Sequence, residues 1–101
     1  MAKGYWVTSY RSVSNPTAFS EYAALAGPAI TAGGGRFLAR GPATKIVALP
    51  AQQPVLDPRI VIIEFDSLQQ AIATYESAGY QAALKVLGNA VERETRLVEG
   101  A

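Results

Sequence analysis

The stretch RIVIIEFD, residues 59–66, is the strongest strand signal in the chain. Its run of apolar residues is mostly β-branched, which is typical of a central strand buried in a sheet. Glu64 interrupts this apolar run. A carboxylate at the end of such a strand lies either near solvent or inside a cavity, so Glu64 is the first residue to examine for chemistry. Other elements are expected before and after this strand.

A strand and a helix are expected at the start of the chain. GYWVTSYRSV, residues 4–13, is rich in aromatic and β-branched residues, which favours a strand. Asn15 suits the N-cap of a helix, and Pro16 suits its first position. An expected kink at Pro28 follows from the missing N–H of proline. Apolar residues at spacings of three and four predict the inner face of this helix: Phe19, Tyr22, Ala23, Ala26 and Ile30.

GGGRFLARG, residues 33–41, raises the question of a phosphate-binding loop. The G-x-G-x-x-G pattern fails because Leu38 occupies its last glycine position. These glycines also follow a predicted helix, whereas phosphate-binding loops precede one. We interpret the glycines as a helix C-cap and turn. A strand over residues 36–49 is expected to follow, with a bulge at Gly41 and Pro42.

Helical and strand signals also follow the central strand. Ser67 and Gln70 match a capping box for a second helix, and Ser77 is expected to cap its continuation after a break. Residues 93–100 predict a short last strand. The order β-α-β-β-α-β is typical of an α+β, ferredoxin-like fold, with a four-stranded antiparallel sheet and two helices on one face. Residues 1–101 are expected to form a single domain.

The amino-acid composition limits the classes of function that the chain can have. Half of the residues are hydrophobic and 17% are charged, so we expect a homodimer through the open sheet face. The net charge of +1 argues against nucleic-acid binding. The N-terminus lacks the pattern of a signal peptide, and no apolar run is long enough to span a membrane, so a cytoplasmic location is expected. Without cysteine or histidine, the chain cannot build a thiol nucleophile, a His-containing triad or a His-ligated haem or metal site. No cofactor and no metal are expected.

Candidate functional residues come from the strands on either side of the loop 50–58. Strand alternation places Arg36, Leu38 and Arg40 on one face, and a hairpin symmetric about Gln52 would place Arg40 opposite Glu64. The pair is either a cross-strand ion pair or part of a cavity. In the second case Arg40 could hold a carboxylate or an enolate oxygen, and burial would raise the pKa of Glu64 and make it a base.

Five segments together resemble a known family. KGYWV, GGRFLARG, RIVIIEF followed by Ser67, YESAGYQAA and RLVEG are similar, in order and spacing, to the domain of unknown function 1330. The resemblance implies the dimeric α/β-barrel superfamily, in which two ferredoxin-like sheets close into a barrel. That superfamily includes cofactor-free monooxygenases, muconolactone-type isomerases, haem-degrading enzymes and stress-response proteins. Leu87 and Ser9 stand where the family often has a polar or basic residue and a histidine, respectively. The recurrent family residues correspond to Tyr22, Gly34, Gly35, Arg36, Leu38, Arg40, Gly41, Glu64, Phe65, Tyr75, Ser77 and Tyr80.

Three functions remain open from the sequence. The first is a homodimer that binds a small aromatic or carboxylic acid molecule between sheet and helices. The second is a cofactor-independent monooxygenase or isomerase of an enolisable or aromatic acid. The third is a structural or regulatory dimer without a ligand. The candidate ligand-binding residues are Tyr22, Arg36, Arg40, Glu64 and Tyr75, and the candidate catalytic residues are Glu64, Arg40 and Tyr80.

Overall fold

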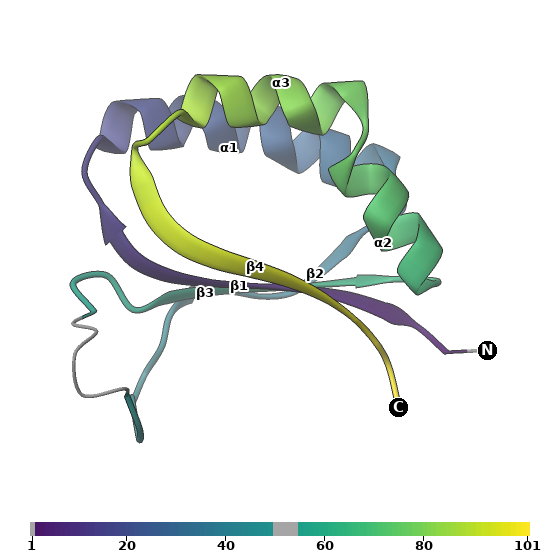
Figure 1. Cartoon of the computed structure of the whole chain (residues 1–101), viewed down its shortest axis with the longest axis horizontal. Helices are drawn as coiled ribbons and strands as arrows, with labels where there is room; N and C mark the ends of the chain where they lie inside the picture. The colour runs from purple at the N-terminus through teal and green to yellow at the C-terminus, as the bar shows by residue number, and fades with distance from the viewer. Residues whose placement is uncertain (1, 50–54) are drawn as a thin grey trace.

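The computed structural model describes residues 2–49 and 55–101 and has the expected ferredoxin-like architecture (Figure 1). Its four strands form one antiparallel sheet in the order β2-β3-β1-β4, and all helices cover the same face. The second helical region is two helices rather than one, so the order is β-α-β-β-α-α-β. The elements are β1 (Gly4–Val13), α1 (Pro16–Ala32), β2 (Arg36–Pro42), β3 (Arg59–Phe65), α2 (Leu68–Tyr75), α3 (Ala78–Leu87) and β4 (Val91–Glu99).

The helix starts agree with the caps predicted from the sequence. The side chains of Asn15, Ser67 and Ser77 each accept a hydrogen bond from the backbone N–H three residues later. The reciprocal half of the predicted capping box is not formed. The Gln70 side-chain amide donates instead to the carbonyl oxygen of Gly33, at 2.7 Å, and so ties α2 to the end of α1. α1 continues through Pro28 to Ala32.

The glycine run is the corner between α1 and β2, as predicted. Gly34 has φ of 89°, a conformation that glycine adopts without steric cost. The backbone N–H of Gly35 bonds to the carbonyl of Ile30 at 2.9 Å, which satisfies one of the free carbonyls at the helix end. These glycines therefore end a helix and do not open one.

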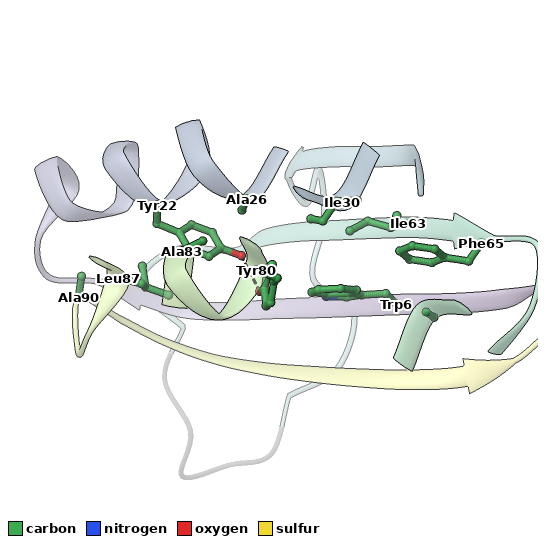
Figure 2. Close-up of a cluster of buried hydrophobic side chains, with 11 residues drawn as sticks. Trp6, Tyr22, Ala26, Ile30, Ile63, Phe65, Tyr80, Ala83, Leu87 and Ala90 are labelled. Atoms are coloured by element: carbon green, nitrogen blue, oxygen red, sulfur yellow. Dashed lines mark hydrogen bonds between the residues drawn. The ribbon is translucent and has the colours of Figure 1, made fainter. Parts of the chain in front are cut away.

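The hydrophobic core lies between the helices and the sheet (Figure 2). The largest of its fully buried side chains are Trp6, Tyr80, Phe65 and Ile63. The Trp6 and Tyr80 rings meet edge to face, with centroids 4.7 Å apart. The core brings β1 and β3, the two central strands, against α3.

The β2–β3 hairpin differs from the prediction in length and register. β2 ends at Pro42 rather than continuing to residue 49. Its irregularity lies between Phe37 and Ala39, not at Gly41 and Pro42. The register of the hairpin pairs Arg36 with Glu64, so the predicted pairing of Arg40 with Glu64 is wrong. The extra residue at the irregularity then moves Arg40 to the face opposite Arg36, where it pairs with Val61. Gln52, the predicted centre of the hairpin, lies outside the described residues, as do residues 50, 51, 53 and 54 of the predicted loop.

Candidate functional site

A cavity of about 390 Å³ lies between α1 and the sheet. This volume is within the range typical of small-molecule sites. α1 provides one wall, and the helix-covered face of all four strands provides the other. Its lining residues are Trp6, Thr8, Tyr10, Phe19, Tyr22, Ala23, Ala26, Gly27, Ile30, Phe37, Arg40, Gly41, Pro42, Arg59, Val61, Ile63 and Arg93.

One end of the cavity is apolar. Phe37 pairs with Ile63 in the sheet, and Ile63 pairs in turn with Trp6, so the three side chains form a row across three strands. Ile30 of α1 closes this end from above (Figure 2). The Trp6 indole N–H is directed to the Thr8 hydroxyl at 3.1 Å, so its hydrogen-bonding requirement is met within the protein. This end offers ring faces and aliphatic groups to a ligand.

The other end contains a partly buried arginine surrounded by phenols. One Arg93 nitrogen, Nη1, donates to the hydroxyl oxygens of Tyr10 at 2.8 Å and Tyr22 at 3.1 Å. Its Nη2 donates to the Tyr80 oxygen at 3.1 Å. The hydroxyls of Tyr22 and Tyr80 are themselves hydrogen-bonded at 2.7 Å, as the dashed line in Figure 2 shows. We call these four residues the Arg93 cluster.

Two tyrosines of the Arg93 cluster, Tyr10 and Tyr80, stay neutral at physiological pH. Burial raises the pKa of Tyr80 far above its ordinary value of 10.0, and this effect exceeds the opposing influence of Arg93. Burial likewise raises the pKa of Tyr10. Among the described residues, no Asp or Glu forms a salt bridge with Arg93. The guanidinium is therefore solvated by dipoles, and its positive charge is not cancelled by a carboxylate.

Two more arginines border the cavity. Arg59 lies over the Phe19 ring, with its guanidinium carbon 4.8 Å from the centroid, and its Nη2 is 3.9 Å from Asp57 Oδ2. Arg40 lies over the Phe37 ring at 4.4 Å. None of the described residues that line the cavity is acidic. The lining consequently carries a net positive charge.

The structure brings only some of the predicted site residues to this cavity. Tyr22 and Arg40 line it, and Tyr80 contacts it through Arg93 and Tyr22. The Tyr75 ring packs behind the cavity wall, 5.4 Å from the Trp6 ring. Arg36 and Glu64 lie on the opposite, open face of the sheet, because strand alternation directs their neighbours Phe37 and Ile63 toward the helices.

The surroundings of Glu64 are those of a structural ion pair and differ from those expected for a buried catalytic base. Its Oε2 accepts a hydrogen bond from the Tyr5 hydroxyl at 3.0 Å, and its Oε1 accepts from Arg36 Nη2 at 3.1 Å. These hydrogen bonds, that from Tyr5 first, lower the pKa of Glu64 below its ordinary value. The raised pKa considered from the sequence is therefore not found.

Two cationic residues of the cavity lining, Arg93 and Arg59, were not among the candidates selected from the sequence. Arg93 lies between Glu92 and Glu94 in the sequence, and such a run of charged residues is typical of a solvent-exposed segment. β4 instead begins at Val91, and strand alternation separates Arg93 from both carboxylates. Arg93 shares the helix-covered face with Thr95 and Leu97, which pair with Thr8 and Trp6. This alternation was the signal that could have identified it.

The described residues, 2–49 and 55–101, contain no group of three or more acidic side chains that could hold a metal ion. Within the same residues, no helix is both long and apolar enough to cross a membrane.

The four-stranded antiparallel sheet, covered by helices on one face, places the protein in the ferredoxin-like class of α+β folds. The model of the family called Domain of unknown function (DUF1330) matches residues 3–101, and the chain belongs to this family. None of the curated proteins compared with the chain matches it in sequence.

Solved structures share the fold at low sequence identity. A protein of unknown function from Rhodopseudomonas palustris has a TM-score of 0.73 at 20% identity, covering 97% of this chain and 80% of that one. A cofactor-independent oxygenase from Streptomyces nogalater has a TM-score of 0.65 at 11% identity, covering 97% and 92%. A dimeric ferredoxin-like protein of unknown function from Thermobifida fusca has a TM-score of 0.63 at 14% identity, covering 96% and 90%. These similarities establish the fold.

Proposed function

We propose that this protein binds a small aromatic or carboxylic acid molecule in the cavity between α1 and the sheet. The observation that carries the proposal is the cavity itself, which has aromatic walls at both ends and a few polar groups gathered at one of them. Such a combination is typical of small-molecule sites, where apolar surface supplies affinity and convergent polar groups supply orientation. Tyr22 and Arg40, two of the residues expected from the sequence, are part of the lining.

The binding unit in this proposal is a homodimer formed through the open sheet face. Val7, Ile60 and Ile62 place apolar side chains on that face, which the helices of this chain leave uncovered (Figure 1). The segment after β2 leaves the sheet on the same side and exposes Val47, with 84% of its surface accessible. A second copy of the chain would cover these apolar groups. The dimeric state of the Thermobifida fusca protein, which shares the fold, supports a dimer of this chain.

Native mass spectrometry of the purified protein, before and after denaturation, tests the proposal. We expect a dimer carrying additional mass that is lost on denaturation. A matched pair of variants locates that mass: Ala23 lines the cavity, whereas Ala24 does not, and both are exposed on α1. Ala23→Trp should abolish retention of the ligand and Ala24→Trp should preserve it. Equal retention by both variants would refute binding in this cavity, and a bare monomer would refute the dimer.

A cofactor-independent enzyme acting on an enolisable or aromatic acid is the second candidate. The Tyr22–Tyr80 hydrogen bond beside Arg93 favours it, because a charged guanidinium and a neutral phenol can together stabilise an enolate oxygen. Exchange of the benzylic protons of phenylpyruvate, followed by NMR in heavy water, tests this activity. An enzyme should accelerate the exchange and lose the acceleration in Tyr80→Phe. Binding without acceleration would leave a binding protein, and neither binding nor acceleration would leave a structural or regulatory dimer.

A further inference from the structure

We infer that the cavity selects aromatic anions and binds them in one orientation, with the anionic group at Arg93 and the ring against Trp6. This inference rests on the proposed binding function and specifies its ligand class. It also assigns the anion-binding role chiefly to Arg93, a residue that the sequence analysis did not select.

The orientation follows from how the strands arrange their side chains. On the helix-covered face, successive rows of residues cross the sheet. The first row contains Phe37, Ile63, Trp6 and Leu97. The next contains Arg40, Val61, Thr8 and Thr95. In the third row Tyr10 pairs with Arg93, and Arg59 lies beside the Tyr10 ring at 5.9 Å. The cavity therefore changes from apolar to cationic along the strand direction.

The distance between the ends sets the size of the ligand. Trp6 and Tyr10 are four residues apart on β1, which corresponds to about 13 Å along a strand. A cavity of about 390 Å³ and this length accommodates one or two fused rings with a short acidic substituent. The ring would lie between Trp6 and Phe37, and its acidic substituent would reach Arg93.

The charge preference follows from the partners of the arginines. Arg93 donates three hydrogen bonds to phenol oxygens and forms no salt bridge within the described part of the chain. A guanidinium has five N–H donors, so Arg93 retains donor capacity for a carboxylate. Arg59, at the same end, has a carboxylate partner only at 3.9 Å. A bound carboxylate would thus meet a positive potential in a partly desolvated site, where charge-assisted hydrogen bonds are strong.

Isothermal titration calorimetry with three probes of the same shape tests this inference. The probes are naphthoate, its neutral amide naphthamide and the naphthylmethyl ammonium cation. We expect naphthoate to bind about tenfold or more tightly than naphthamide, in line with the strength of charge-assisted hydrogen bonds, and the cation to bind most weakly. Arg93→Met should remove most of the naphthoate preference and should change naphthamide affinity much less.

Arg96→Met is the matched control, because Arg96 lies on the same strand but on the open face, with 76% of its side chain exposed. It should retain the preference for naphthoate. If circular dichroism shows that Arg93→Met does not fold, Arg59→Met provides the second variant and should weaken naphthoate binding selectively, by a smaller factor.

The outcomes separate this inference from the proposed function. Equal affinity for naphthoate and naphthamide would overturn the anion selectivity but leave a small-molecule site. A full naphthoate preference that survives in both Arg93→Met and Arg59→Met would overturn the anion-binding role of this end of the cavity. Failure of all three probes to bind at millimolar concentration would overturn the proposed aromatic-binding function together with the inference.

Discussion

Two arginines on opposite faces of the same sheet have contrasting environments. Arg36, on the open face, lies 3.1 Å from a Glu64 oxygen and 3.2 Å from an Asp66 oxygen. Arg93, beneath the helices, contacts three phenol oxygens and forms no salt bridge with any described residue. Carboxylates cancel the charge of the first arginine, whereas phenols solvate the second without cancelling it.

The contrast between Arg36 and Arg93 indicates which face of the sheet is suited to bind a ligand. An exposed ion pair such as Arg36–Glu64 is satisfied by the chain and contributes little to stability. A partly buried guanidinium without a counter-ion is costly to maintain, and such a cost is commonly found at functional sites. The difference between the two arginines thus favours the helix-covered cavity over the open face as the ligand site.

The largest expected effect is a difference in stability between two variants, each of which removes one tyrosine hydroxyl from one face of the sheet. Tyr80→Phe leaves Arg93 Nη2 and the Tyr22 hydroxyl without their common buried partner. We expect it to lower the free energy of unfolding by about 1–2 kcal/mol. Tyr5→Phe removes the corresponding hydroxyl beside Glu64, where water can replace it, and should have a much smaller effect. Urea unfolding measures both, and equal losses would contradict the comparison.

Alkaline pH should destabilise the protein mainly through the Arg93 cluster. Because the pKa of Tyr80 is raised above its ordinary value of 10.0, the folded chain retains a proton that the unfolded chain loses. The stability contributed by the neutral phenol is fully present below about pH 10 and decreases as the pH rises further. Urea midpoints measured across this range should fall less steeply for Tyr80→Phe than for the unchanged protein. Identical slopes would show that Tyr80 does not control the alkaline limb.

Acid pH should destabilise the protein through the carboxylates of the open face. The effect should be smaller than that of alkaline pH on the Arg93 cluster. The pKa of Glu64 is lowered first by Tyr5 and then by Arg36, and the pKa of Asp66 is lowered first by Lys3 and then by Arg36. Both carboxylates therefore contribute stability that is present above their unfolded pKa values and is lost as the pH falls through the folded values. We expect Glu64→Gln combined with Asp66→Asn to flatten the acid limb of a urea-midpoint profile.

Arg93→Met provides the contrast for the acid measurement. Since Arg93 has no carboxylate partner among the described residues, this variant should leave the slope of the acid limb unchanged. A steeper or flatter acid limb in Arg93→Met would indicate a carboxylate coupled to the cluster and would weaken the case for an uncancelled charge.

The fold could be predicted from local signals in the sequence. The β-branched run at 59–66, the caps at Asn15, Ser67 and Ser77, and the glycine corner are encoded within a few residues each, and the structure confirms them. The register of β2 could not be predicted in this way. Its irregularity between Phe37 and Ala39 depends on pairing with β3, and one extra residue moves every following side chain to the other face.

The site was only partly predictable for the same reason. Tyr22 was assigned to the inner face of α1 by helical spacing, and the structure places it at the cavity. Arg93 and Tyr22 are far apart in sequence, and only the antiparallel pairing of β1 with β4 brings Arg93 beneath α1. The glutamates on either side of Arg93 project to the opposite face of the sheet. Tertiary pairing, rather than local composition, creates the cluster.

A crystal structure of the protein grown with naphthoate would show directly whether the cavity binds an aromatic anion with its charged group at Arg93. We expect one naphthoate per chain between α1 and the sheet, with its carboxylate within hydrogen-bonding distance of Arg93 and its rings against Trp6. A naphthoate bound on the open face, or one in the cavity with its carboxylate directed at Trp6 and away from Arg93, would contradict the account.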